Sequence, residues 1–264
     1  MEKDVYKEIV KIRAEGEEAA LVTVISANGS TPQKEGAKML VRADGSIVST
    51  VGGGRVEAEI ISEAVGVIKK CKPQRLSYDL SEGGNAEMLC GGNFEVFIEP
   101  ILQVPNLFIF GGGHISLPLV KMANLAGFKI VVVDAPEVAN AETFPEAEQT
   151  LALDLARGFS DSELKINKSG YVVIVTRDHK HDEVVLESAL GTRAKYIGLV
   201  GSQTKTKAIF SSLLARGISQ ELLDKVYTPI GLKINARTPE EIAVSILAEL
   251  IKVRRGAQTE TGAK

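Results

Sequence analysis

Three consecutive glycines in the second half of the chain have the spacing of an anion-binding turn. Gly111, Gly112 and Gly113 follow the apolar run 107–110 and precede His114, which opens a segment with helical periodicity. A strand, a glycine turn and a helix in this order bring backbone N–H groups to the start of the helix, where they can hold a phosphate. Gly111 permits the tight turn, and Gly113 permits the close approach of an anion. We therefore predict a ligand-binding turn here.

An acidic residue follows at the distance expected for a dinucleotide site. Asp134 ends the next apolar run, 21 residues beyond Gly113, where a carboxylate can hold a ribose diol. Ser116 stands at the third glycine position of the usual pattern, and we expect it to loosen the packing of helix on strand slightly. An NAD(P) site is one interpretation of this unit. A glycine turn that binds nothing is another.

All three histidines map to one predicted edge of a sheet. His114 opens the helix after the glycine turn, and His179, His181 and Asp182 follow the apolar run 171–176. A His-x-His-Asp sequence can ligate a metal ion. No third pair of ligands occurs at a suitable spacing, so we do not expect a dedicated zinc site. The alternative is a surface loop in which Asp182 caps the following helix.

Two further segments offer hydrogen-bond donors to an anion. The segment 198–207 is a second strand-to-helix turn, with Ser202 and two lysines available. The first half of the chain has its own glycine turn, which opens a helix and forms a potential oxyanion site. A plain glycine-rich bend is the alternative for this turn. Its residues are Gly52, Gly53, Gly54 and Arg55.

The chain contains two cysteines, Cys71 and Cys90. Cys90 precedes Gly91 and Gly92 at the predicted start of a strand, where an accessible thiol could ligate a soft metal or carry sulfur. Cys71 lies between two lysines at a helix end, and we give it no role. A chain of this size with two cysteines is no disulfide scaffold, which favours the cytosol.

Hydrophobic periodicity divides the chain into two domains and a tail. Residues 1–104 predict a smaller α+β domain, with a hairpin turn at 42–45 and a short strand at 46–51. Over residues 105–256, continuous apolar runs alternate with helices, which is typical of a Rossmann-type, doubly wound parallel sheet. Thr238 and Glu241 predict a capping box at the start of the last helix. Residues 257–264 are expected to be a frayed tail.

Composition and charge exclude several classes of function. The formal net charge of −3 offers no basic field for nucleic acid. The N-terminus is charged where a signal peptide would be apolar, and no apolar run approaches the roughly 20 residues of a membrane span. We therefore expect a cytoplasmic protein that binds neither nucleic acid nor membranes.

At these motifs the chain resembles the XdhC/CoxI family, the accessory factors of xanthine dehydrogenase and related molybdenum hydroxylases. The resemblance runs over nearly the whole chain. The motifs that carry it are GSTPQKEGAKMLV, STVGGGRVEAE, LCGGNFEVFIEPI, FIFGGGHIS, VVVDA, TRDHKHDEVVL, YIGLVGSQTKT and YTPIGLKINARTPEEIAVSILAEL.

The resemblance implies a maturation factor or chaperone that has no turnover of its own. Such a factor binds and protects molybdenum cofactor, in its molybdopterin or dinucleotide form. It supports sulfuration by a cysteine desulfurase and inserts the cofactor into an apo molybdenum hydroxylase such as xanthine or carbon monoxide dehydrogenase. A homodimer is also implied. Many members have cysteine where this chain has Arg55, which leaves Cys90 as the single candidate molybdenum ligand. The other positions carried over are Gly52–Gly54, Gly91, Gly92, Gly111–His114, Asp134 and His179–Asp182.

Two other classes of function stay open at this level. An NAD(P)-dependent oxidoreductase would use the Rossmann half, although the sequence shows no convincing partner set for hydride transfer. A regulatory or scaffolding protein would keep the fold without the ligand, and Arg55 in place of a thiol favours that reading.

Overall fold

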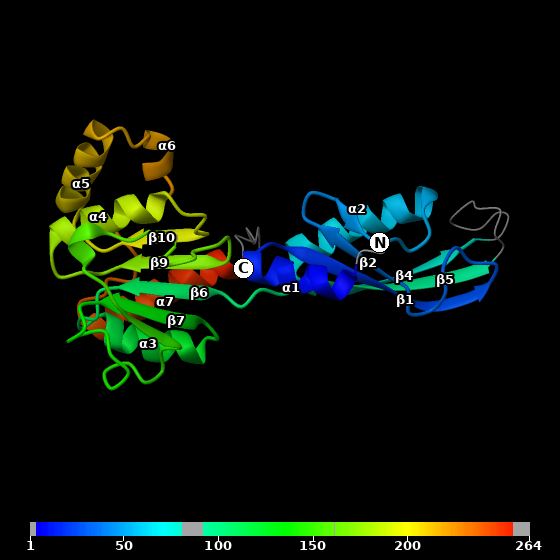
Figure 1. Ribbon diagram of the computed structural model, residues 1–264, viewed down its shortest axis with the longest axis horizontal. Coiled ribbons are helices and arrows are strands. Elements are labelled where there is room, and N and C mark those ends of the chain that lie inside the picture. The colour runs from blue at the N-terminus through cyan, green and yellow to red at the C-terminus, as the bar shows by residue number, and fades with distance from the viewer. Residues whose placement is uncertain (1–3, 81–91, 161, 256–264) are drawn as a thin grey trace. The chain divides into compact units, whose positions relative to one another are not determined.

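The chain divides into two compact units, each with its own sheet and core (Figure 1). The computed structural model describes residues 4–80, 92–160 and 162–255. The first unit is Met1–Gln103 and the second is Val104–Lys264, so the division falls one residue before the predicted boundary. The predicted tail, 257–264, lies outside the described residues.

The first unit is an antiparallel five-stranded sheet in the order β3-β2-β1-β5-β4. Helix α2 packs on one face of this sheet and α1 on the other. The elements in chain order are α1 (Val5–Glu15), β1 (Ala19–Gly29), β2 (Lys38–Arg42), β3 (Ile47–Val48), α2 (Gly54–Lys70), β4 (Gln74–Asp79) and β5 (Gly92–Ile101).

Strand β1 shows why this sheet takes a helix on each face. Ala20, Val22 and Val24 belong to the core under α2, whereas Ala19 and Leu21 belong to the core under α1. Successive side chains of a strand point to opposite faces, so a strand that is apolar at every position must be covered twice. The first unit is therefore α+β, as its sequence predicted.

The second unit is a six-stranded sheet in which every paired neighbour is parallel. Its elements are β6 (Asn106–Phe110), α3 (Ser116–Leu125), β7 (Lys129–Asp134), β8 (Gln149–Ala152), the short helix η1 (Leu155–Arg157), β9 (Gly170–Ile174), α4 (His179–Leu190), β10 (Tyr196–Leu199), α5 (Gln203–Ala215), α6 (Gln220–Leu223), β11 (Val226–Tyr227) and α7 (Pro239–Arg255).

The strand order of this unit, β11-β10-β9-β6-β7-β8, confirms the doubly wound fold. Counted from β6, it is the order 3-2-1-4-5-6 of a Rossmann sheet. The chain reverses its winding direction between β6 and β9, which are hydrogen-bonded neighbours. In sheets of this kind ligands bind outside the carboxyl ends of the strands at that reversal.

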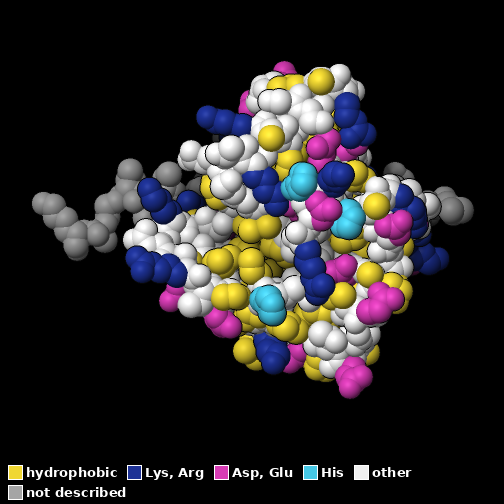
Figure 2. Space-filling view, turned by 90° about the vertical axis from the view of Figure 1, so that its left-hand side faces the viewer, with side chains coloured by type: hydrophobic (Ala, Val, Ile, Leu, Met, Phe, Trp, Pro, Cys, Tyr) yellow, Lys and Arg dark blue, Asp and Glu magenta, His cyan; other side chains and the backbone are white. Residues whose placement is uncertain are grey.

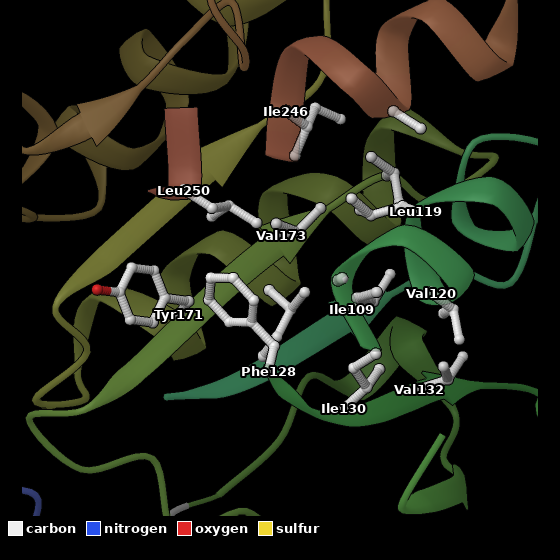
Figure 3. Close-up of a cluster of buried hydrophobic side chains, with 14 of the residues drawn as sticks. Ile109, Leu119, Val120, Phe128, Ile130, Val132, Tyr171, Val173, Ile246 and Leu250 are labelled. Carbon is white, nitrogen blue, oxygen red and sulfur yellow. The ribbon is translucent and has the colours of Figure 1, made fainter. Parts of the chain in front are cut away.

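Helices cover both faces of the parallel sheet (Figure 1). Leu107 and Ile109 of β6 pack in the core under α3 and α7, and Phe108 and Phe110 pack in the core under α4 and α5. Figure 3 shows the first of these cores, where Leu250 of α7 and the strand side chains meet. Burying one such large apolar side chain contributes about 1.5–3 kcal/mol. The continuous apolar run of β6 thus predicted a strand buried on both faces.

Two details of the secondary structure test the sequence predictions closely. The capping box of α7 is confirmed, because Glu241 N–H donates to Thr238 Oγ1 (3.2 Å) and Thr238 N–H donates to Glu241 Oε2 (3.2 Å). The strand predicted over 46–51 is too long. Ser49 has φ 67°, in the left-handed region, which ends β3 at Val48 and starts the turn toward α2.

None of the helices in the described part of the chain combines the length and the apolar character that crossing a membrane requires.

Candidate functional site

The carboxyl edge of the parallel sheet collects most of the predicted site residues of the second unit. The glycine turn follows β6, Asp134 ends β7, and His179 begins the helix after β9. Because these strands are parallel neighbours, their carboxyl ends lie side by side. Figure 2 views the second unit from this side, and histidine side chains lie there around a hollow with an apolar floor.

Two of the three glycines are required by close packing. Gly111 has φ 107°, and a Cβ atom built on it would lie 2.5 Å from the carbonyl oxygen of Val175. A Cβ atom on Gly112 would lie 2.4 Å from Cγ1 of Val138. Gly113 differs from both, because its Cβ atom would meet nothing within 4 Å. The first two glycines of the turn are therefore packed closely against other residues, and the third borders open space.

Asp134 closes one side of the turn. Its Oδ2 atom accepts a hydrogen bond from the N–H of Gly112 (2.7 Å), and its Oδ1 atom accepts one from the N–H of Ala135 (2.7 Å). The sequence placed this carboxylate near a ribose and missed its bond to the turn itself. Since the carboxylate is held by two main-chain groups, it is fixed beside the turn before any ligand arrives.

The next three N–H groups of the turn remain available. Among the described residues, no acceptor takes the N–H of Gly113, His114 or Ile115. These residues directly precede α3, whose ten residues add the partial positive charge of a helix N-terminus. Three converging donors with open space at Gly113 can bind a phosphate or another oxyanion.

Ser116 corrects the expectation of looser packing. Its side chain is fully buried, and its hydroxyl donates to the carbonyl oxygen of Gly111 at the end of β6. The hydroxyl thus ties the first turn of α3 to the strand, in place of the close backbone contact that a glycine would give. Serine fills this position without loosening it.

The histidine segment forms the first turn of α4. Asp178, and not Asp182, is the N-cap, and its Oδ1 atom accepts from the N–H of Lys180 (3.0 Å). That hydrogen bond, followed by the charges of His179 and His181, holds the pKa of Asp178 below its usual range. The side chain of His179 is exposed and lies 3.1 Å from Asp178. His181 is half-buried.

Asp182 lies inside the protein, where it can contact no ligand directly. Its carboxylate is fully buried, accepts from Thr176 Oγ1 (2.6 Å) and pairs with Lys205 Nζ. The interpretation of Asp182 as a surface cap is therefore wrong. A buried carboxylate needs such partners because an unpaired charge is costly there. Asp182 instead holds Lys205 at the carboxyl edge, a position that the sequence identified only as one of two lysines.

Ser202 takes a helix-capping role. Its Oγ atom accepts from the N–H of Lys205 (3.3 Å) at the start of α5. The residue is exposed. Ser202 thus accepts from the backbone N–H of Lys205, and Asp182 pairs with the ammonium group of the same lysine.

The glycine turn of the first unit is closed by a carboxylate of its own helix. Glu57 Oε2 accepts from the N–H groups of Val51 (3.0 Å) and Gly53 (3.1 Å), and it also accepts from Thr50 Oγ1. From the sequence alone, Glu57 was given no role. Its position four residues after Gly53 was the signal that it could reach back to the turn.

The loop after β1 lies close to this turn and to the start of β5. A Cβ atom on Gly52 would lie 2.4 Å from Cβ of Pro32, and one on Gly92 would lie 2.8 Å from the carbonyl oxygen of Ser30. Gly54 and Arg55 are exposed at the start of α2. The loop after β1 therefore contacts two of the predicted elements. Cys90 and Gly91 lie outside the described residues.

Among residues 4–80, 92–160 and 162–255, no three histidine, cysteine, aspartate or glutamate side chains gather in a way that could hold a metal ion.

The fold defines a two-unit protein whose second unit is a Rossmann-type domain with a glycine turn at its carboxyl edge. Comparison with known proteins then gives the family: the XdhC Rossmann domain matches residues 107–250, and the XdhC and CoxI family model matches residues 12–79. The chain belongs to the XdhC/CoxI family, as its motifs indicated.

Relatives of known name extend this result. The chain is 33% identical to the uncharacterized protein YqeB of Escherichia coli over 96% of its own length, but it spans only 47% of YqeB. It is 25% identical to the molybdenum cofactor insertion chaperone PaoD of Escherichia coli, over 90% of this chain and 84% of PaoD. A crystal structure described as a xanthine dehydrogenase from Bacillus halodurans matches 97% of both chains with a TM-score of 0.50 and 24% identity, which supports the fold alone.

Proposed function

We propose that this protein is a maturation factor that binds molybdenum cofactor and inserts it into an apo molybdenum hydroxylase such as xanthine or carbon monoxide dehydrogenase. Two facts support the proposal. The family is that of XdhC and CoxI, and the relative PaoD, matched over 90% of this chain, is named a molybdenum cofactor insertion chaperone. A protein of this kind carries a cofactor and catalyses no reaction of its own.

The open glycine turn is the observation that carries the proposal to particular atoms. Molybdopterin bears a phosphate, and its dinucleotide form bears a pyrophosphate. The N–H groups of Gly113, His114 and Ile115 have no protein acceptor among the described residues and lie at the start of α3. We assign the phosphate to these donors, with Lys205 and the histidines of the same edge as further hydrogen-bond donors.

Five further features belong to the same proposal. Cys90 is the candidate molybdenum ligand, because molybdenum favours sulfur, and a cysteine desulfurase is the source of sulfur for the bound cofactor. Arg55 is suited to a phosphate and not to molybdenum. The active form is a homodimer, and the protein works in the cytoplasm.

A single substitution tests the assignment of the phosphate. Gly113→Asp places a carboxylate into the open space before the three donors, and no backbone strain follows because Gly113 does not have a left-handed φ. We expect the variant to bind molybdopterin at least about tenfold more weakly than the unaltered protein, a difference of about 1.4 kcal/mol or more. The measurement is an equilibrium titration of the purified chain with the cofactor.

Gly66→Asp is the matched control, because a Cβ atom on Gly66 of α2 also meets nothing within 4 Å. It should bind the cofactor as the unaltered chain does. Equal affinity of the Gly113→Asp variant and this control would remove the turn from the proposal.

Insertion into an apo-hydroxylase tests the thiol separately. We expect Cys90→Ser to lower the activity recovered by the apo-enzyme, while Cys71→Ser, at the exposed second cysteine, leaves it unchanged. If both variants load the apo-enzyme equally well, Cys90 has no part in the transfer.

An NAD(P)-dependent oxidoreductase is the second candidate, and the position of Asp134 favours it. A carboxylate at the end of the second strand of a Rossmann unit can hold a ribose diol and would repel the 2′-phosphate of NADP. Titration with NADH distinguishes the two functions. Micromolar binding that is retained in the presence of saturating molybdopterin would support the oxidoreductase, and the maturation factor predicts competition or no binding.

A further inference from the structure

A second hollow lies at the amino edge of the parallel sheet, opposite the glycine turn. It has a volume of about 680 Å³ and is lined by residues that precede β9, β10 and β11, together with the ends of α4 and α6. All of its lining residues belong to the second unit. This volume is within the range of small-molecule sites, roughly 300–1,000 Å³.

Positive side chains gather at this hollow because the strands are parallel. Lys168 comes two residues before β9, and Lys195 and Lys225 come directly before β10 and β11. Parallel neighbours bring their amino ends to one edge, so the three lysines line the same hollow, and Arg193 joins them from the loop before β10. The pattern of a lysine before each of three consecutive strands is visible in the sequence.

Negative charge is scarce there. Among the described residues that line the hollow, Asp224 is the one acid, and its Oδ1 atom already accepts from Gln220 Nε2 (2.7 Å). Arg193 and Lys225 have no acidic partner within the described part of the chain. The positive charge of Arg193 and Lys225, which no acid of the described residues pairs with, attracts an anion.

The floor of the hollow is apolar and one wall is aromatic. Leu190, Ile197 and Val226 are each less than a tenth exposed and form part of the lining. Tyr227 is 39% exposed, and one face of its ring stacks on Tyr196 with a centroid distance of 4.5 Å. A flat ligand ring placed on the outer side of Tyr227 would extend this stack.

The walls are fixed by main-chain hydrogen bonds. Thr192 Oγ1 donates to the carbonyl oxygen of Ala189 (2.7 Å) and accepts from the N–H of Ala194 (3.2 Å). The N–H of Lys195 donates to the carbonyl oxygen of Gly170 (2.8 Å). The loop that carries Arg193 is therefore held between α4 and the sheet, so little ordering of the backbone opposes binding.

We propose that this hollow binds a small organic anion that carries a flat ring, of the size of a nucleoside monophosphate. Arg193 and Lys225 take the anionic end, and Tyr227 with the apolar floor takes the ring. The site is independent of the cofactor turn, because it lies at the opposite edge of the sheet.

Calorimetric titration with AMP tests this site in the Gly113→Asp variant, where the glycine turn is blocked. We expect one AMP molecule to bind, with adenosine and inorganic phosphate each binding more weakly than AMP. Adding Arg193→Glu and Lys225→Glu should weaken AMP binding at least about tenfold. Lys121→Glu with Lys252→Glu is the matched control, since both lysines are exposed and lie away from the hollow.

Tyr227→Leu removes the aromatic ring of the wall, keeps the wall apolar and leaves the cationic residues in place. It should weaken the binding of AMP and leave that of inorganic phosphate unchanged. The proposal is overturned if the Gly113→Asp variant does not bind AMP, or if both charge-reversed variants bind it equally. Binding of an acidic peptide such as hexaglutamate in preference to AMP would also overturn it and would make the hollow a protein-docking site.

Discussion

The two glycine turns of this molecule have similar sequences and different hydrogen-bonding states. In the first unit, Glu57 takes the N–H groups of Val51 and Gly53 together with the hydroxyl of Thr50. In the second unit, Asp134 takes the N–H of Gly112, and no acceptor among the described residues takes the N–H of Gly113, His114 or Ile115. The N–H groups of Gly54 to Val56 at the start of α2 likewise have no acceptor in the described part of the chain, so the two turns differ in how many of their groups the nearest acid takes.

The difference comes from where the carboxylate stands in the chain. Glu57 belongs to the helix that its own turn begins, so its side chain reaches back to the N–H groups of Val51 and Gly53, which precede that helix. Asp134 ends a neighbouring strand and reaches the turn from the side. The position of the nearest acid in the chain therefore decides how many groups of each turn the protein itself occupies.

The largest expected effect comes from the tight side of the second turn. Gly111→Ala forces a Cβ atom to within 2.5 Å of the carbonyl oxygen of Val175, at φ 107°. We expect a loss of about 2–5 kcal/mol in the free energy of unfolding, from overpacking and backbone strain together. Gly113→Ala, in open space, should change it by less than about 1 kcal/mol. Urea unfolding of both variants checks this, and equal losses would mean that the turn has no open side.

The closed turn should become an anion site when its own carboxylate is removed. Glu57→Ala leaves two main-chain donors without an acceptor, at an expected cost of about 1–3 kcal/mol in the free energy of unfolding. Sulfate should then raise the melting temperature of the variant more than that of the unaltered chain. Glu59→Ala, an exposed position on the same helix, is the control. No added response to sulfate would show that the first turn lacks the geometry to bind an anion.

The hydroxyl of Ser116 has a smaller effect. Ser116→Ala removes the buried hydrogen bond to the carbonyl oxygen of Gly111 and should cost about 1 kcal/mol in the free energy of unfolding. Chemical unfolding measures this loss. A variant as stable as the unaltered chain would mean that the hydroxyl does not tie α3 to β6.

The smallest effect concerns the start of α4 at the carboxyl edge of the parallel sheet, where Asp178 is the N-cap. The N–H of Lys180 lowers the pKa of Asp178 in the folded protein. The cap therefore stabilises α4 above about pH 4, and this contribution is lost as the pH falls through the lowered pKa. Hydrogen exchange of the Lys180 N–H should accelerate over that range, relative to its intrinsic rate. Asp178→Asn should abolish the pH dependence, and an unchanged profile in that variant would exclude the cap as its source.

The fold was largely predictable because its signals are local. The apolar run at 107–110 identified a strand covered on both faces, and Thr238 with Glu241 identified a helix start. The early end of β3 at Val48 was not predicted, because the left-handed conformation of Ser49 has no signature in a residue type that rarely adopts it.

The sequence predicted where the candidate site lies, but not which hydrogen bonds and ion pairs its residues form. The sequence placed Gly111–Gly113 and Asp134 at one edge, since both follow strands of the same parallel sheet. It could not show that Asp134 bonds to Gly112, or that Asp182 is buried against Thr176 and Lys205. Those facts depend on side-chain directions and on residues far apart in the chain, which spacing alone does not determine.

Backbone NMR of the purified protein tests the central claim most directly, because the claim concerns three N–H groups. On titration with molybdopterin, the ¹H–¹⁵N resonances of Gly113, His114 and Ile115 should shift most, downfield in the proton dimension, while those of Val51 and Gly53 stay in place. Saturable shifts confined to the first turn, or no shift at the three groups while the cofactor binds, would contradict the account.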